Sequence, residues 1–123
     1  MIRKIVSWGL VASAVLSLGA CATPARFEWG GYEGALYTYV KKPDRRPGYR
    51  EALETAIAKG RQTDRVAPGL LAELGYLYLE DGDTARAVPL FEEEMRRFPE
   101  AKPFMTSVIE RAKTMNQTAE VKS

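Results

Sequence analysis

The chain has 123 residues, 46% of them hydrophobic and 28% charged, which suits one folded domain and excludes a disordered or fibrous chain. It has one Cys and no His, which excludes an internal disulfide, most zinc sites and Ser-His or Cys-His nucleophilic catalysis. Arg3 and Lys4 account for the formal net charge of +2, so 16 basic and 16 acidic residues remain beyond residue 20 and no nucleic-acid partner is indicated.

The first 20 residues have the pattern of a secretory signal peptide. A positive start precedes a mostly apolar run at residues 5–18, which is shorter than the roughly 20 apolar residues of a membrane-spanning helix. The run leads into Leu18, Gly19 and Ala20, and small residues there let an extended backbone enter a peptidase. We therefore expect residues 1–20 to be removed.

The Leu18-Gly19-Ala20-Cys21 stretch resembles the lipobox of bacterial lipoproteins. The resemblance implies that a diacylglyceryl group joins the Cys21 thiol, that the chain is cut after Ala20, and that the new amino group is acylated, as with palmitate. This lipid is the only non-protein group expected, with no cofactor or metal. Ala22 stands where an Asp resembles the inner-membrane retention signal of Gram-negative bacteria, which favours the periplasmic face of the outer membrane. The alternative is a Cys that merely follows a conventional signal peptide.

Two polar segments are expected to flank the folded part. Residues 21–28 are predicted to form a tether, which reaches at most about 25 Å when fully extended and would keep the domain near the membrane. Residues 116–123 are predicted to be a flexible tail. The folded domain is therefore placed at residues 29–115.

Apolar residues at helical spacing predict an all-α domain, because strand and hairpin signals are weak. Prolines and glycines delimit the helices, Asp83 is a predicted N-cap, and Pro89 is expected to kink the fourth helix. Trp29 is expected in the core. The predicted helices cover residues 29–40, 48–59, 68–81, 84–98 and 103–115, with loops at residues 41–47 and 60–66.

The middle of the chain matches the tetratricopeptide pattern over residues 68–101. The matching positions are Leu71-x2-Leu74-Gly75-x2-Tyr78, then Ala87-x3-Phe91, then Pro99. Small residues at Gly75 and Ala87 let two antiparallel helices approach, while Tyr78 and Phe91 fill the space between them. Leu71 and Glu94 depart from the pattern, which commonly has Trp and a small Ala at these positions.

A degenerate copy of the repeat is predicted before this one. Trp29, Tyr32 and Leu36 match the first helix, and Ala52 and Ala56 match the second. The spacing leaves seven extra residues, which we assign to an insertion at residues 41–47 in the turn. We thus expect a short tetratricopeptide-like array of two helical hairpins, with the last helix capping the open end.

The mature chain also resembles a family of small, poorly characterised proteobacterial lipoproteins of tetratricopeptide type. The resemblance rests on three stretches: Trp29-Gly30-Gly31-Tyr32-Glu33-x2-Leu36-Tyr37, then Pro68-Gly69-Leu70 with Glu73-x-Gly75-Tyr76, and Glu80-x-Gly82-Asp83. It implies a cell-envelope assembly with a lipoprotein similar to the curli secretion pore and another small lipoprotein. It implies no reaction.

Two surfaces are candidates for binding. On the tetratricopeptide register, a partner groove would be lined by Ala72, Tyr76, Leu79 and Glu80. The alternative is that neighbouring chain covers this groove. A basic surface is predicted at the insertion, facing anionic headgroups or an acidic partner, or serving only as a solvated turn. Its residues are Lys41, Lys42, Arg45, Arg46 and Arg50.

No catalytic residues are assigned. The acidic run at residues 92–94 is interpreted as the solvated side of a helix, because paired catalytic carboxylates face one another across a cleft. The leading hypothesis is a non-catalytic interaction or scaffold module at the outer membrane, with another envelope lipoprotein or pore protein as partner and no small-molecule substrate. The alternative is a pilotin-like assembly factor for a secretin or pore, and an enzyme acting on peptidoglycan is a third, disfavoured class.

Overall fold

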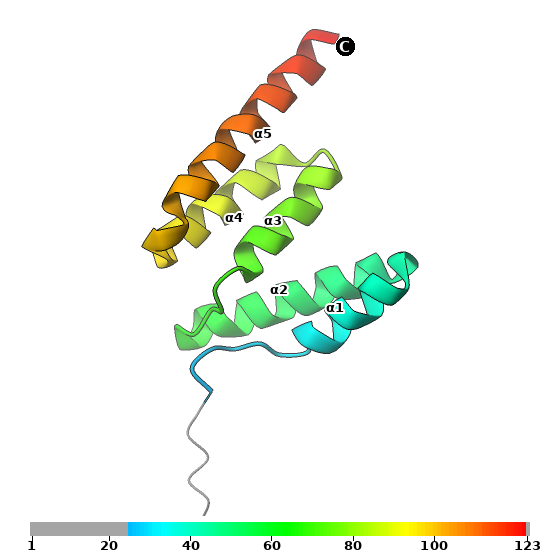
Figure 1. The fold of residues 1–123 in the computed structure, drawn as a ribbon, viewed down its shortest axis with the longest axis vertical. Coiled ribbons are helices and arrows are strands. Elements are labelled where there is room, and N and C mark those ends of the chain that lie inside the picture. The colour runs from blue at the N-terminus through cyan, green and yellow to red at the C-terminus, as the bar shows by residue number, and fades with distance from the viewer. Residues whose placement is uncertain (1–24, 123) are drawn as a thin grey trace, which may run out of the picture.

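The computed structural model describes residues 25–122, and helices account for most of them (Figure 1). The α-helices are α1 (Tyr32–Lys41), α2 (Arg46–Thr63), α3 (Leu70–Glu80), α4 (Thr84–Arg97) and α5 (Lys102–Lys122), and the short 3₁₀ turns are η1 (Pro43–Arg45) and η2 (Pro99–Ala101). The predicted all-α class is confirmed. Within the described residues, no helix is both long and apolar enough to cross a membrane.

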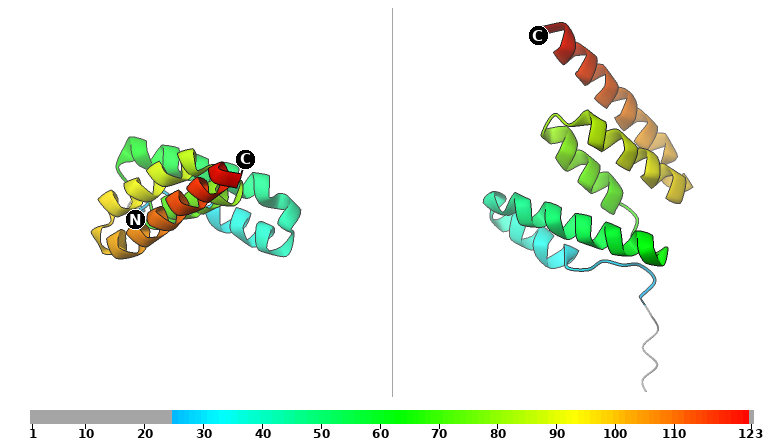
Figure 2. Two further views of the ribbon diagram at one scale, coloured as in Figure 1. Left: turned by 90° about the horizontal axis from the view of Figure 1, so that it is seen from above. Right: turned by 180° about the vertical axis from the view of Figure 1, so that it is seen from behind.

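The helices stack in chain order. α1 packs against α2 and α3 against α4, which gives two antiparallel hairpins, and α2 contacts α3 where the hairpins meet. α5 packs against α4 and forms the far end of the stack (Figures 1 and 2). This is the predicted arrangement of two hairpins followed by one further helix.

One apolar core runs through the stack, and its centre is the interface of α3 with α4. A Cβ built on Gly75 would lie 2.6 Å from the Cε1 atom of Phe91, so only glycine lets the ring pack this closely on α3. Ala87 is fully buried on α4, as the repeat pattern predicts. The largest fully buried side chains are Phe91, Leu53, Ile57, Leu70, Leu71 and Met105.

The first hairpin differs from its prediction at both ends of α1. The helix begins at Tyr32, because Gly30 has a φ of +52° that ends any helical path from Trp29. Trp29 thus lies outside the helix and is 37% exposed rather than in the core.

The predicted insertion at residues 41–47 is wrong as a loop, because most of it is helical. Pro43 begins η1 and Pro47 lies in the first turn of α2, where a proline removes no intrahelical hydrogen bond. Only Lys42 has an extended backbone between the two helices. Of these seven residues, Lys41 ends α1, Pro43–Arg45 form η1, and Arg46 and Pro47 begin α2.

α2 also extends past its predicted end at Lys59. Gly60 stays inside the helix because Val66 packs directly on it: a Cβ there would lie 2.7 Å from the Val66 Cα. The helix ends at Thr63, and Asp64 follows with a φ of +52°, the left-handed conformation that terminates helices.

The polar tail predicted beyond Met115 is helical as far as Lys122. No glycine or proline follows Pro103, and the turns of this segment are bridged by polar contacts. Asn116 Nδ2 donates to Glu120 Oε1 at 3.0 Å, and the Thr118 hydroxyl donates to the carbonyl of Thr114 at 2.9 Å. Side chains at these spacings support a helical segment whose residues are all exposed.

α4 is continuous through Pro89, which lies on its exposed side. At its start the predicted N-cap is confirmed: the Asp83 carboxylate accepts a hydrogen bond from the Arg86 backbone N–H at 2.9 Å. This contact satisfies one of the free N–H groups of the first turn.

Candidate interaction surfaces

Cys21 and the Leu18, Gly19 and Ala20 stretch lie outside the described residues. The structure instead shows where the chain enters the domain. The Glu28 N–H donates to the Arg65 carbonyl at 2.7 Å, and the Arg65 guanidinium donates to the Ala25 carbonyl at 3.2 Å. The predicted tether at residues 21–28 is therefore fixed to the end of α2 from residue 25 onward.

The residues of the predicted groove are not fully open. Ala72, Tyr76 and Leu79 are half-buried and pack against the core. The Tyr76 ring lies edge-on to the ring of Phe91, with 5.2 Å between centroids. Glu80 is exposed but pairs with Arg46 at 3.1 Å. Neighbouring chain thus covers much of this surface, which was the alternative left open from the sequence.

The predicted basic surface is divided into two parts. Arg46 and Arg50 reach across from α2 to the end of α3, where both bind the Asp81 carboxylate. Arg46 also donates to the Leu77 carbonyl at 2.7 Å. Although partial burial opposes it, hydrogen bonding from Arg50 and Arg46 holds the pKa of Asp81 below its usual value. These two arginines tie the hairpins together, so their assignment to a free basic surface is wrong.

The other three cations remain available. Lys41, Lys42 and Arg45 are exposed at the tip of the first hairpin. The Lys41 ammonium lies 5.6 Å from the centroid of the Tyr37 ring, and Arg45 makes only a loose pair with Asp44 at 3.8 Å.

A seam of tyrosines and carboxylates also joins the two hairpins. The hydroxyls of Tyr32 and Tyr49 both donate to the carboxylate of Glu73 on α3. Tyr78 donates in the opposite direction, from α3 to Glu54 on α2 at 2.7 Å. Burial and the adjacent Glu73 raise the pKa of Tyr32 to about 12 and that of Tyr49 as well. These phenols stay neutral and serve as structural donors.

The acidic run at residues 92–94 is not the solvated face that the sequence suggests. Glu94 is only 3% exposed, and its Oε1 accepts the Gly69 N–H at 2.6 Å. Burial raises the pKa of this carboxyl, opposed by backbone N–H groups at the start of α3. Glu93 binds Arg97 at 2.8 Å and Arg61. Glu94 therefore links α4 to the start of α3, and Glu93 links α4 to the end of α2.

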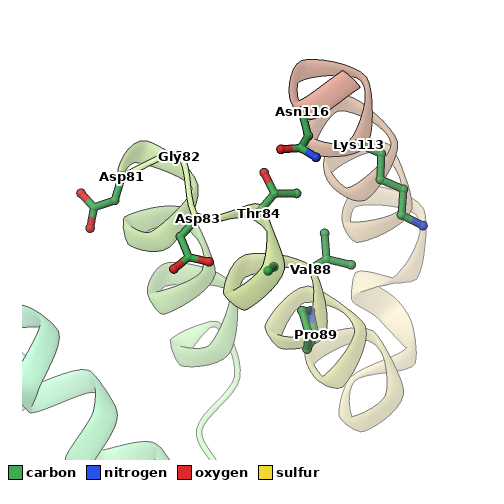
Figure 3. Close-up of a pocket in the computed structure, with 9 residues that line it drawn as sticks. Asp81, Gly82, Asp83, Thr84, Val88, Pro89, Lys113 and Asn116 are labelled. Atoms are coloured by element: carbon green, nitrogen blue, oxygen red, sulfur yellow. The ribbon is translucent and has the colours of Figure 1, made fainter. Parts of the chain in front are cut away.

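A hollow lies between the start of α4 and the outer half of α5 (Figure 3). It has a volume of about 720 Å³ and is open to solvent. Thr84 and Asn116 point toward one another across it, whereas Asp81 points away. The lining residues are Asp81, Gly82, Asp83, Thr84, Ala85, Val88, Pro89, Lys113 and Asn116. Within residues 25–122, no three Asp, Glu, His or Cys residues converge as metal ligands would.

An apolar stripe on α5 is the most exposed feature of the far end. Phe104 is 62% exposed and Met115 is 55% exposed, while Val108 between them is half-buried. Their spacing places them on one side of the helix, beside the buried row of Met105, Ile109 and Ala112. The predicted capping helix thus lacks the polar outer face of a terminal repeat.

These observations define an all-α protein of stacked helical hairpins, which several polar contacts tie together. The chain belongs to a family described as a domain of unknown function, DUF4810, which matches residues 27–108. No curated protein and no solved structure matches the chain. Membership confirms the predicted resemblance to a poorly characterised family.

Proposed function

We propose that the protein is a lipid-anchored, non-catalytic interaction module of tetratricopeptide type, held at Cys21 on the periplasmic face of the outer membrane. The single observation that carries the interaction role is the exposed apolar stripe of α5. The lipobox-like stretch carries the anchoring role.

The repeat register explains why the stripe is open. Phe104 and Val108 follow Leu70 and Leu74 by 34 residues, the length of one tetratricopeptide repeat. Leu70 is 1% and Leu74 is 4% exposed, because α3 lies between α2 and α4. α5 has α4 on one side, and no second neighbouring helix follows it within the described residues. It therefore occupies the place of a first helix whose partner helix is absent from this part of the chain.

The partner that fits is an amphipathic helix of another envelope protein, lying where the second helix of a third hairpin would lie. Arg111, Met115 and Lys122 line one shallow hollow on α5, so cations flank the apolar stripe. A helix with an apolar face and acidic flanks complements this surface in both shape and charge.

Two roles follow from the family resemblance. The leading one is a stable complex with a pore-forming lipoprotein similar to the curli secretion pore. The second is pilotin-like, in which the same stripe holds a helix of a secretin only until that secretin assembles. A peptidoglycan enzyme is the least favoured class, since attachment of the diacylglyceryl group to the Cys21 sulfur would leave the chain with no free thiol, and it has no His. Hydrolysis of peptidoglycan by the purified protein would overturn this proposal.

Photo-crosslinking in the native envelope tests the interaction. A photoreactive residue at Phe104 should give one protein product, whereas the same residue at exposed Ala58 on α2 should not. A pore lipoprotein captured in fixed stoichiometry supports the leading role, and a secretin captured only during assembly supports the second. Tyr76→Ala should leave the product unchanged, because Tyr76 packs on Phe91. Equal products from both photoreactive positions contradict the proposal.

Mass analysis of the envelope protein tests the anchor. The N-terminal peptide should begin at Cys21 and carry the mass of a diacylglyceryl group and an acyl chain. Cys21→Ser should abolish both the lipid and the cut after Ala20. An unmodified Cys21 in the wild-type protein contradicts lipidation.

A further inference from the structure

Exposed large apolar side chains occur only at the two ends of the stack, among the described residues. Trp29, Tyr37 and Val40 lie at the N-terminal end, and Phe104, Met115 and Val121 lie on α5. α2, α3 and α4 contribute none. The proposed partner helix covers only the apolar side chains of α5. The exposed apolar side chains at the N-terminal end therefore indicate a second binding surface.

The N-terminal end is a single layer along α2, formed by residues 25–41. Residues 25–31 follow the second half of α2: Glu28 pairs with Val66, and a Cβ on Gly30 would lie 3.5 Å from the Ala56 Cβ. α1 follows the first half, where the Tyr39 ring stacks on the Tyr49 ring at 5.1 Å. Both parts lie on the same side of α2 in opposite views (Figures 1 and 2).

The outward face of this layer suits a headgroup region. Tyr32 and Tyr39 face α2, so Tyr37, which is 67% exposed, lies on the opposite side of α1. Val40 is 68% exposed beside it, and the Lys41 ammonium lies over the Tyr37 ring. Tyrosine and lysine combine an apolar body with a polar tip and are enriched where a membrane meets water.

The charge at this end is complementary to anionic lipid. Arg26, Lys41, Lys42 and Arg45 are exposed there, against the exposed carboxylates of Glu33 and Asp44. Within residues 25–122, neither Lys41 nor Lys42 forms an ion pair with a carboxylate. The excess cations are attracted to anionic headgroups within about 10 Å at 0.1 M salt.

Chain length brings the layer and the anchor together. Ala25 is fixed by Arg65, and the chain from Cys21 to Ala25 reaches at most about 14 Å. α2 alone is about 27 Å long, at about 1.5 Å for each of its 18 residues. A bilayer that holds a lipid on Cys21 must therefore lie close to the side of the domain that carries Ala25.

We propose that the layer of residues 25–41 rests on the phospholipid headgroups of the leaflet that holds the Cys21 lipid, with α5 directed away from the membrane. This orientation rests on the proposed lipid anchor. It assigns one end of the stack to lipid and the other to protein.

The experiment attaches the lipid chemically. The chain from Cys21 onward has one thiol, which can be coupled to a maleimide lipid in vesicles of brominated phosphatidylcholine and phosphatidylglycerol. Trp29 is the only Trp in that chain, so Trp29→Phe with Tyr37→Trp places one fluorophore on the outward face of α1. The matched control is Trp29→Phe with Phe104→Trp.

Bromine quenching and a blue shift are expected for the Trp at residue 37, while the Trp at residue 104 keeps the emission of the protein without vesicles. Equal quenching at both residues, or none at residue 37, overturns the orientation. Emission at residue 37 that shifts with protein concentration in the absence of vesicles assigns the face to a second copy and also overturns it. Because coupling replaces cellular lipidation, none of these results depends on the anchor proposal, which the mass of the envelope protein tests separately.

Charge reversal provides a second readout. Lys41→Glu, Lys42→Glu and Arg45→Glu together should lessen the quenching at residue 37, and added salt should lessen it in the parent. Arg111→Glu, Lys113→Glu and Lys122→Glu reverse three exposed cations on α5 and should leave the quenching unchanged. The same loss in both triple variants contradicts a specific lipid-facing side. Circular dichroism checks that each variant is folded.

Discussion

Gly75→Ala tests the packing of α3 on α4 most directly. The new Cβ would lie 2.6 Å from Cε1 of Phe91 and 3.0 Å from two further ring carbons. Carbon atoms prefer separations of about 3.5–4.0 Å, so the ring must move. Phe91 is fully buried, and overpacking a filled core costs about 1–3 kcal/mol.

Gly34→Ala in α1 is the matched control. It is also a glycine inside a helix, but nothing lies within 4 Å of the place where its new Cβ would stand. Replacing either glycine adds about 1 kcal/mol of helix propensity. The free energy of unfolding should therefore rise for Gly34→Ala. The difference between the two variants isolates the overpacking cost, about 1–3 kcal/mol.

Urea unfolding monitored by circular dichroism measures both free energies, and thermal unfolding gives a second estimate. For a domain of this size, each kcal/mol shifts Tm by about 4–8 °C. Gly75→Ala should thus melt at least about 4 °C below Gly34→Ala. Phe91→Leu should lessen the effect of Gly75→Ala, because contacting residues are not additive. Equal stability of the two alanine variants would refute the packing argument.

Three further predictions concern two polar contacts and the exposed end of α5. Glu94→Gln should remove a pH dependence of the free energy of unfolding. Burial raises the pKa of this carboxyl, so the carboxyl contributes stability below about pH 4.3, the pKa of Glu in an unfolded chain. That contribution is lost as the pH rises through the pKa of the folded state. Unfolding curves from pH 4 to pH 8 should therefore favour the variant increasingly toward high pH, and parallel profiles would contradict this. Asp83→Ala should lower stability by about 1 kcal/mol in urea, because the Arg86 N–H loses its cap, and Asp83→Asn should retain most of it. Deleting residues 116–123 should leave Tm nearly unchanged, since the described side chains there are all exposed, while the far-ultraviolet helix signal falls.

The close packing of α3 on α4 could be predicted because it depends on the sizes of a few residues, and residue size is visible in the sequence. Gly75 and Ala87 must be small where two helices cross, and Phe91 must be large to fill the space they leave. These requirements fall at fixed spacings along a helix, so the sequence shows them without knowledge of the rest of the fold.

The ends of the helices could not be predicted in the same way. Gly60 and Pro47 are poor helix formers in an isolated segment, yet both lie in α2. Val66 packs on Gly60 from outside the helix, and Pro47 lies in the first turn, where it removes no hydrogen bond. A tertiary contact therefore accounts for Gly60 at the end of α2, and such contacts leave no local pattern in the sequence.

The polar contacts between helices were missed for a related reason. Glu73, Glu94 and Arg50 look like ordinary surface residues of amphipathic helices. Their partners are Tyr49, Gly69 and Asp81, at least 24 residues away in the chain. From the sequence, only Tyr76 was assigned a binding role, as part of a partner groove. Tyr32, Tyr49 and Tyr78 are instead donors to carboxylates across the two hairpins.

The assignment of these side chains to contacts between helices changes which parts of the surface can bind a partner. Side chains on α2, α3 and α4 are largely committed to the core and to ties between hairpins, so the middle of the stack offers few apolar atoms to a partner. Two hairpins are fewer than the three repeats that usually bury a helical-repeat core, so each end carries apolar surface that a longer array would cover.

A ligand that binds only the folded state raises its stability. Occupation of the α1 end by lipid and of the α5 end by a helix should therefore each raise Tm, and because the two sites are separate, the increments should add. A purified chain that is equally stable with and without vesicles would show that its N-terminal end does not bind lipid.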